Sequence, residues 1–141
     1  MRFKRWLESE MIPVKNVKQN HNYDCGAAAL KSIAHFYDVP LESEREFIKL
    51  CDTSKRKGTH PDDIVAAARA LGLRAGLYDH MSLDQLKSTL DKRIPVICAI
   101  QAYGEESDYD EPMNGHYVIA VGYDDRNIYF EDPSLKDSRF P

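Results

Sequence analysis

The sequence has no long hydrophobic run. The longest, Ile94 to Ile100, is far shorter than the ~20 apolar residues that cross a bilayer, and it contains Pro95. The first residues are basic, but acidic residues follow at once, and the apolar core of a secretory signal is missing. We therefore expect neither a membrane span nor a secretory signal in this sequence.

Cysteines are few and widely spaced. The three of them, Cys25, Cys51 and Cys98, are an odd number, which does not fit a disulfide framework. Without a signal peptide, free thiols in a reducing cytoplasm are the expectation. Cys51 and Cys98 lie on predicted apolar faces and are expected to be core residues, which leaves Cys25 to be explained.

An excess of positive charge is also missing. The chain has 19 Lys and Arg against 23 Asp and Glu, a formal net charge of −4. Non-specific nucleic-acid binding depends on Lys and Arg that neutralise phosphates, so this composition argues against it. With 141 residues, 43% of them hydrophobic, we expect one domain over residues 12–141, preceded by an N-terminal arm or short helix over residues 1–11.

Four helices are predicted in the first two thirds of the chain. The first follows Asp24, a good N-cap residue, and its alanines have high helix propensity. The third begins at Pro61, a preferred first position of a helix, and Gly72 ends it. Ser82 and Gln85 form the pattern of a capping box before the fourth. The predicted ranges are 25–37, 43–51, 61–71 and 82–90.

Strands are predicted mainly after the fourth helix, where apolar residues become continuous. They cover residues 95–101, 117–123 and 127–132, with a turn between the last two. A short strand is also predicted over residues 73–78. Helices first and an antiparallel sheet second make an α+β domain.

The position of Cys25 suggests a reactive thiol. It opens the first predicted helix, behind a polar loop, where unpaired N–H groups and the helix dipole stabilise a thiolate. A thiolate is the attacking group of cysteine peptidases and acyltransferases. The alternative is a small buried residue, and position alone leaves both open. Gly26 in the first turn indicates that another group approaches the backbone there.

His116 and Asp132 lie at the two ends of the predicted hairpin, and their positions suggest that they act together. One possible register of the hairpin pairs residues whose numbers sum to 250. In this register Asp132 lies opposite Val118, one diagonal step from His116 on the same face. A shift of one residue would put the two side chains on opposite faces. In the first register Asp132 can accept a hydrogen bond from a ring N–H of His116 and fix its tautomer, as the third member of a catalytic triad does.

Two further interpretations involve residues near Cys25. Gln19, six residues earlier, could aim its amide at the thiol and form an oxyanion hole with the Cys25 N–H, although alone it is an ordinary surface residue. A metal site is the competing interpretation, and its candidate ligands are His21, Cys25, His60 and His116. The close ligand pairs of structural zinc sites are missing, so no metal is expected.

These residues resemble the motifs of a known family. Gln19, five intervening residues and Cys25-Gly-Ala-Ala-Ala-Leu resemble the Gln…Asp-Cys-Gly-x-Ala-x-Leu motif of the bacteriocin-processing, papain-like endopeptidases, family thirty-nine of the cysteine peptidases. The interval of 16 between His116 and Asp132 fits the family, and the resemblance covers roughly residues 12–135. Further landmarks follow in order: Gly58-Thr59, Ala-Leu-Gly-Leu at 70–73, Pro95-Val-Ile, Gly115-His116-Tyr-Val-Ile-x-Val-Gly-Tyr and Asp132-Pro133.

The resemblance implies a fold and a set of roles. The fold is papain-like, with an N-terminal helical lobe packed on a C-terminal antiparallel sheet and a cleft between them. The implied roles are Cys25 as nucleophile, His116 as general base and then acid, Asp132 as orienting residue and Gln19 as oxyanion donor. The implied substrate is a peptide or protein, and hydrolysis through an acyl-thioenzyme needs no metal or organic cofactor. Members fused to transporters cut leader peptides after a Gly-Gly pair.

The chain looks more like the standalone branch of the family, because no transmembrane or ATP-binding region follows in the sequence. Standalone members usually continue further, so the chain is expected to be truncated at Pro141 or short there. An acidic insert over residues 101–114 is typical of that branch. It would favour a basic or polar substrate if it lines the cleft, and a solvated loop is the alternative. Its acidic residues are Glu105, Glu106, Asp108, Asp110 and Glu111.

Two other functions stay open from the sequence. One is a peptide-binding module that keeps the fold without cutting, although family domains with that role lack the cysteine that is present here as Cys25. The other is acyl transfer to an amine, which uses the same three residues. The sequence predicts neither the substrate, the cleavage site nor the oligomeric state.

Overall fold

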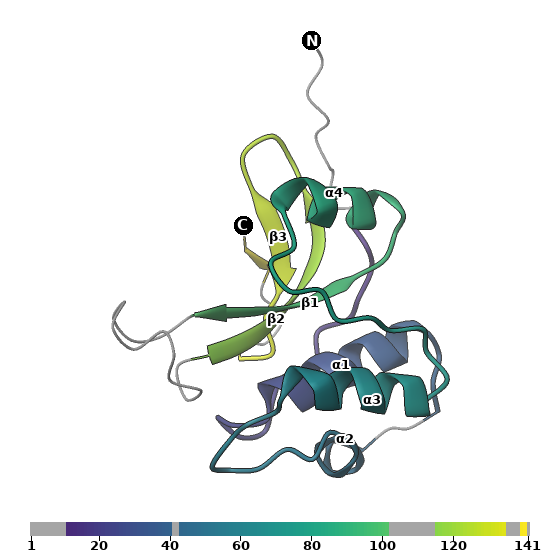
Figure 1. Ribbon diagram of the computed structural model, residues 1–141, viewed down its shortest axis with the longest axis vertical. Helices are drawn as coiled ribbons and strands as arrows, with labels where there is room; N and C mark the ends of the chain where they lie inside the picture. The colour runs from purple at the N-terminus through teal and green to yellow at the C-terminus, as the bar shows by residue number, and fades with distance from the viewer. Residues whose placement is uncertain (1–10, 41–42, 102–114, 135–138, 141) are drawn as a thin grey trace.

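Four helices precede a four-stranded antiparallel sheet in the chain. The computed structural model describes residues 11–40, 43–101, 115–134 and 139–140, and Figure 1 shows their arrangement. The helices come before the strands, which confirms the predicted α+β class. The elements are α1 (Cys25–Phe36), α2 (Glu44–Leu50), α3 (Pro61–Ala70), α4 (Leu83–Asp91), β1 (Val96–Gln101), β2 (Gly115–Tyr123), β3 (Ile128–Glu131) and β4 (Arg139–Phe140).

The sheet has the strand order β1-β2-β3-β4, so β2 lies inside it and is paired on both sides. Ile119 pairs with Glu131 and Ala120 with Phe130, and both pairs of numbers sum to 250. A bulge between Ala120 and Gly122 shifts the register by one residue nearer the turn. The register that brings Asp132 to the face of His116 is therefore the one present at that end of the hairpin.

Helix α1 is buried on two faces, not on the single face that its apolar spacing predicts. Ala29 and Ile33 belong to a core cluster shared with the sheet, whereas Leu30 and Ala34 belong to a second cluster with α2 and α3. Alanine has little side chain to keep neighbours apart, so an alanine-rich helix can be approached from both sides. As a result α1 contacts the sheet on one face and α2 and α3 on another.

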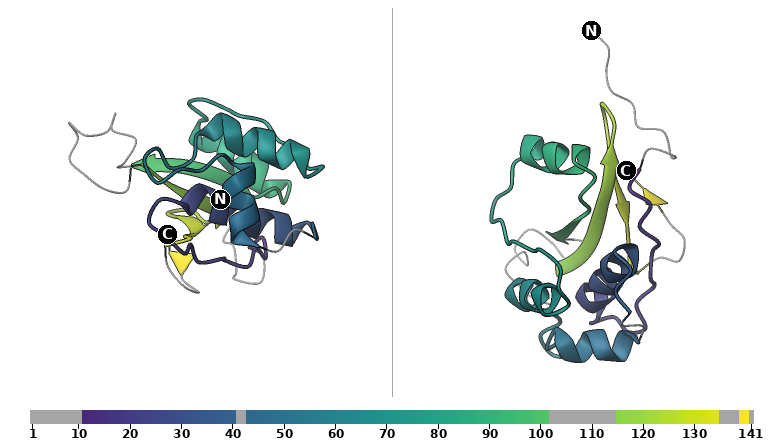
Figure 2. Two further views of the ribbon diagram at one scale, coloured as in Figure 1. Left: turned by 90° about the horizontal axis from the view of Figure 1, so that it is seen from below. Right: turned by 90° about the vertical axis from the view of Figure 1, so that its right-hand side faces the viewer.

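Helix α4 packs on β1 and β2, and the edge-on view in Figure 2 places it on the opposite side of the sheet from α1. The predicted capping box is confirmed. The Ser82 hydroxyl accepts from the Gln85 N–H at 3.1 Å, and the Gln85 side chain accepts from the Ser82 N–H at 2.8 Å. Pro61 opens α3 as predicted, and Gly72 follows its end with a φ of +87°.

The strand predicted over residues 73–78 does not form. Its backbone groups find other partners, because the Leu73 N–H donates to the Ala68 carbonyl at the end of α3 and the Arg69 guanidinium donates to the Ala75 carbonyl. Leu73 and Ala75 pack against the core, but Leu77 and Tyr78 are 48% and 71% exposed, so the end of the segment is not buried. The sequence analysis did not predict β4, which pairs with β3.

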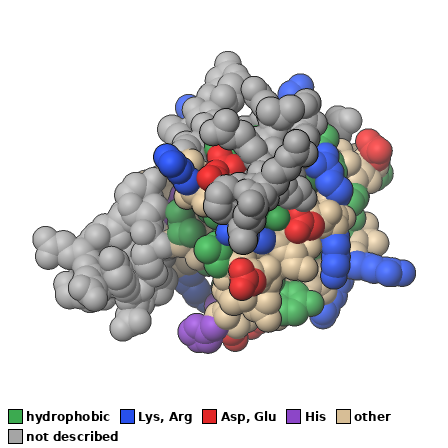
Figure 3. Space-filling model, turned by 90° about the horizontal axis from the view of Figure 1, so that it is seen from above, with side chains coloured by type: hydrophobic (Ala, Val, Ile, Leu, Met, Phe, Trp, Pro, Cys, Tyr) green, Lys and Arg blue, Asp and Glu red, His purple; other side chains and the backbone are tan. Residues whose placement is uncertain are grey.

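Some expectations fall on residues outside the described ranges. These are the acidic insert, whose residues 102–114 lie there, and the N-terminal arm, of which only Met11 is described. Met11 is 7% exposed and belongs to the core cluster with the sheet. No helix in the described ranges has the length and apolar character that a membrane crossing needs. On the face shown in Figure 3, Lys and Arg side chains are interspersed with Asp and Glu.

Candidate active site

Cys25 is the first residue of α1 and is 9% exposed. Asp24 is the N-cap residue, as predicted, but its carboxylate makes no hydrogen bond to the helix. It accepts instead from the His21 backbone N–H at 3.0 Å and lies 3.1 Å from His21 Nδ1. The predicted N-cap residue is confirmed, and its side chain leaves the N–H groups of the first turn beside Cys25 available.

His116 and Asp132 form a buried pair. His116 Nε2 lies 2.7 Å from Asp132 Oδ1, and the two side chains are 5% and 9% exposed. The Cys25 side chain is a second neighbour of the imidazole, close enough to raise its pKa. Because Nε2 faces Asp132, the other ring nitrogen is left for the thiol. The structure thus brings Cys25, His116 and Asp132 into one connected group.

The surroundings of His116 favour its protonated form. Burial lowers the pKa of the imidazole, but hydrogen bonds to the side chains of Cys25 and Asp132 and the charges of both groups raise it. Together these effects bring the pKa of His116 from 6.5 to about 9. An imidazolium with that pKa can hold a thiolate as an ion pair at neutral pH.

Asp132 has partners besides His116. The Ser134 backbone N–H and hydroxyl both donate to Asp132 Oδ1, at 2.8 Å and 2.7 Å. Burial raises the pKa of Asp132, but the Ser134 hydroxyl, the His116 ring and the Ser134 amide lower it, and the balance lies below the usual range. The Asn16 side-chain amide donates to the Asp132 backbone carbonyl at 2.8 Å. These contacts keep the carboxylate charged and fix its direction.

Gln19 lies beside this group, but its amide is directed elsewhere. Its backbone N–H donates to the Pro133 carbonyl at 2.8 Å, next to Asp132. Its side-chain Nε2 donates to the His21 carbonyl at 2.6 Å, and its Oε1 is buried without a hydrogen-bond partner. An amide nitrogen carries two hydrogens, so one N–H of Gln19 is left for another acceptor.

The loop between Gln19 and Cys25 is anchored from α2. Glu44 is 6% exposed and accepts from the Asn20 backbone N–H at 3.2 Å. Burial and the nearby charge of Asp24 raise the pKa of Glu44. Two buried carboxylates, Asp24 and Glu44, therefore hold the segment that leads into Cys25.

Gly26 allows other groups to approach the backbone of α1 closely, as its position in the first turn predicts. A Cβ built on Gly26 would lie 2.8 Å from Thr59 Cβ and 3.1 Å from Tyr117 Cδ2. Such distances are too short for any side chain, so the loop before α3 and the ring of Tyr117 both rest on the bare helix backbone. The expectation drawn from Gly26 is confirmed.

The other two cysteines differ from Cys25 in their surroundings. Burial, with a smaller effect of Asp63, raises the pKa of Cys51 to about 12. Burial raises the pKa of Cys98 to about 11, although a backbone hydrogen bond at Ala120 lowers it. Both thiols are therefore protonated and unreactive at neutral pH.

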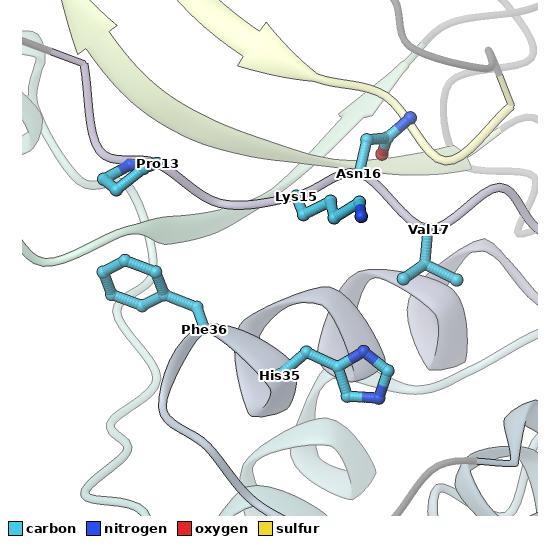
Figure 4. Close-up of a pocket in the computed structure, with 6 residues that line it drawn as sticks. All are labelled: Pro13, Lys15, Asn16, Val17, His35 and Phe36. Atoms are coloured by element: carbon cyan, nitrogen blue, oxygen red, sulfur yellow. The ribbon is translucent and has the colours of Figure 1, made fainter. Parts of the chain in front are cut away.

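Two other kinds of site were considered. Among the described residues, no group of three or more His, Cys, Asp and Glu side chains is arranged to hold a metal. An open pocket of about 550 Å³ lies between residues 13–17 and the last turn of α1, where Figure 4 shows His35 and Phe36. His35 lies roughly 15 Å from Cys25 along α1, whereas Asn16, which also lines the pocket, donates to the Asp132 carbonyl.

Sequence analysis missed several residues of the site. Ser134 is two residues after Asp132, and the Asp-Pro-Ser sequence was a signal, because a Ser at this spacing commonly donates to the Asp carboxylate in a turn. Thr59 and Tyr117 belong to landmark motifs of the family but gave no signal for a role, and Asn16 gave no signal at all. Their contacts join segments that are distant in the sequence.

Comparisons with known proteins were made on this basis. A family model described as the Peptidase C39 family matches residues 13–140. No curated protein matches the chain significantly.

Three solved structures are similar to this chain. The double glycine motif protease of an AMS/PCAT transporter, in complex with the leader peptide, is similar over 93% of this chain and 81% of its own, with 24% identity and a TM-score of 0.69. A C39-like peptidase from Bacillus anthracis is similar over 92% and 86%, with 15% identity and a TM-score of 0.72. The peptidase domain of Streptococcus ComA, a bi-functional ABC transporter of a quorum-sensing pathway, is similar over 90% and 85%, with 26% identity and a TM-score of 0.59.

Proposed function

The chain belongs to the peptidase C39 family and is a cysteine peptidase, and we propose that Cys25, His116 and Asp132 are the residues with which it cuts peptide bonds. Cys25 is the proposed nucleophile, His116 the general base and then acid, and Asp132 the residue that orients the imidazole. One observation carries this proposal. Cys25, from the helical layer, lies near enough to His116, from the sheet, to raise the pKa of its imidazole, which Asp132 holds at 2.7 Å.

The proposed reaction proceeds through an acyl-thioenzyme. His116 holds the thiol proton, the Cys25 sulfur attacks the substrate carbonyl, and a carbon–sulfur bond forms. The imidazolium then protonates the leaving amine as the carbon–nitrogen bond breaks. A water molecule, deprotonated by His116, attacks the thioester and releases the carboxylate product and the free thiol.

The oxyanion of each tetrahedral intermediate needs two donors. The backbone N–H of Cys25 is one candidate, since the N-cap side chain makes no bond to the helix. The second N–H of the Gln19 amide is the other. Gln19 Nε2 donates to the His21 carbonyl, so Gln19 would act as an oxyanion donor through this second N–H or after a rotation of its side chain.

We further propose that the substrate is a peptide cut after a Gly-Gly pair, in the manner of a leader peptide. The similar double glycine motif protease was crystallised with a leader peptide, and the family membership supports the same chemistry here. The protein is proposed to act in the cytoplasm as one domain over residues 12–141. Its three free cysteines fit that location, because a reducing compartment keeps thiols unpaired.

Two alternatives use the same fold. A non-cleaving peptide-binding module would have no need of a cysteine beside an imidazole. An acyltransferase would use the same group but pass the acyl chain to an amine instead of water. The proposed peptidase differs from both in the products that it makes.

Cleavage of a synthetic peptide tests the proposal. A peptide with one internal Gly-Gly pair is incubated with the protein, and the products are identified by mass spectrometry. We expect two fragments separated after the second glycine, and no fragments with Cys25→Ala or His116→Ala. The proposal is contradicted if both variants still produce fragments. It is also contradicted if the wild-type chain cuts no peptide of a library of Gly-Gly peptides. If an amine is added to the wild-type reaction, acyl transfer joins the acyl fragment to that amine by an amide bond. Mass spectrometry detects this product beside the hydrolysed fragment.

A further inference from the structure

Tyr117 links the layer that carries Cys25 to the strand that carries His116. It follows His116 directly in β2, and its hydroxyl donates to the Thr59 backbone carbonyl at 2.7 Å. Thr59 belongs to the loop before α3, 7% exposed. The bond therefore joins the sheet to the helical layer within one residue of the imidazole.

The same loop is held firmly against the first turn of α1. The hydroxyls of Thr53 and Thr59 are 2.6 Å apart, which fixes the direction of the Thr59 side chain above Gly26. The turn between them is closed by two backbone bonds between Ser54 and Gly58, of 3.0 Å and 2.8 Å. Any movement of Thr59 is thus transmitted to the backbone next to Cys25.

Successive residues of a strand point to opposite faces, yet His116 and Tyr117 both reach the first turn of α1. His116 lies near the Cys25 side chain, and the Tyr117 ring rests on Gly26. The end of the helix is in this way contacted from two sides by two adjacent residues of one strand. That arrangement fixes where the sulfur lies relative to the imidazole.

We propose that the Tyr117 hydroxyl is a positioning group for the reaction: by holding Thr59 on the first turn of α1, it keeps the Cys25 sulfur beside His116. This inference rests on the proposed function. Tyr117 does not touch the reacting atoms and acts through the placement of Cys25. Displacements of about 1 Å are enough to lower the rate of such reactions by about 100-fold.

Alkylation of Cys25 by iodoacetamide measures this placement without a substrate. The second-order rate is followed from pH 5 to pH 9 for the wild-type chain and for Tyr117→Phe. We expect the variant to lose about tenfold in rate near pH 6, where only a thiolate paired with imidazolium reacts, and to approach the wild-type rate near pH 9. Cleavage by the same variant should show a lower kcat with little change in KM.

Tyr123→Phe is the matched control. Tyr123 lies in the same strand, and its hydroxyl bonds Asp91 at 2.9 Å, away from Cys25. We expect its alkylation profile to follow the wild-type curve. Equal losses in the two variants, or a Tyr117→Phe profile within twofold of wild type at every pH, would overturn the inference.

The proposed function and the inference fail in different ways. Absence of rapid alkylation near pH 6 in the wild-type chain contradicts the proposed function, whereas rapid alkylation that Tyr117→Phe leaves unchanged contradicts only the role of Tyr117. If Tyr117→Phe does not fold, Thr53→Val decides by the same criterion. It removes the hydroxyl that orients Thr59 while keeping the side-chain shape, so a smaller loss near pH 6 is expected, and no loss overturns the inference.

Discussion

Asp132 is held by Ser134 as well as by His116, so its charge does not depend on one neighbour. Removing the Ser134 hydroxyl with Ser134→Ala takes away a bond that lowers the pKa of the carboxyl, and the pKa should rise toward its ordinary 3.8. A carboxyl whose pKa is lowered on folding stabilises the folded state at pH values above its unfolded pKa. This stabilisation is lost as the pH falls through the folded pKa. We therefore expect Ser134→Ala to cost about 1 kcal/mol at pH 7 and less at pH 3.

Urea unfolding at the two pH values checks this prediction. A loss that is the same at pH 3 as at pH 7 would show that the hydroxyl acts only through packing.

Gly26 offers a second test at the residue scale. Gly26→Ala would push a Cβ to within 2.8 Å of Thr59 Cβ, and we expect a cost of about 1–3 kcal/mol together with slower alkylation of Cys25. Gly72→Ala is the comparison, because a Cβ there meets nothing within 4 Å and only the φ of +87° is strained. Both variants should unfold at lower urea concentrations, but only Gly26→Ala should slow the alkylation.

The pairing of His116 with Asp132 was predictable from the sequence, since a hairpin register and a spacing settle which residues share a face. The close approach at Gly26 was predictable for a similar reason, because a glycine in a helix is unusual. The contact of Tyr117 with Thr59 was not. It joins two segments 58 positions apart, and no local pattern reports such a contact.

The capping box of α4 tests stability at the scale of an element. Ser82→Ala removes the side chain that accepts from the Gln85 N–H, and we expect a loss of about 1 kcal/mol in unfolding free energy. Helix α4 lies across the sheet from α1 (Figure 2), so the alkylation profile of Cys25 should not change. Urea unfolding and alkylation of the same preparation check both statements, and a changed alkylation profile would show that the two faces are coupled.

Elements with strong end signals were predicted well. The starts of α3 and α4 follow from Pro61 and from Ser82 with Gln85, whose effects are local. The strand expected over residues 73–78 was wrong because a strand needs a partner, and the carbonyl of Ala75 is taken by Arg69. The second buried face of α1 was missed because alanine is compatible with burial and with exposure alike.

At the scale of the whole molecule, the candidate site depends on contact between two layers. Cys25 is the first residue of α1, His116 is the second residue of the inner strand β2, and the two side chains meet at the boundary between the layers. Folding of either layer alone would not bring them together. The free energy of unfolding should therefore depend on whether His116 is protonated.

The sign of that dependence follows from the raised pKa of His116. A histidine whose pKa rises from 6.5 to about 9 on folding stabilises the fold fully below pH 6.5 and loses the effect as the pH rises through 9. With Cys25 replaced by alanine, so that no thiol proton passes to the imidazole, we expect the unfolding free energy to fall by on the order of 1–3 kcal/mol between pH 6.5 and pH 9.5, relative to the same chain with His116→Gln. Urea unfolding of both proteins over this range measures the difference, and parallel curves would contradict the raised pKa.

The central claim is that His116, from the sheet, activates the Cys25 thiol at the start of α1. Its most direct measurement is alkylation of the wild-type chain and His116→Ala by iodoacetamide at pH 6, with the modified cysteine identified by mass spectrometry. Cys51 and Cys98, whose pKa values are raised to about 12 and about 11, serve as internal references. The account predicts rapid modification of Cys25 alone, slowed at least about tenfold in His116→Ala. Equal, slow modification of Cys25 in both proteins would contradict it.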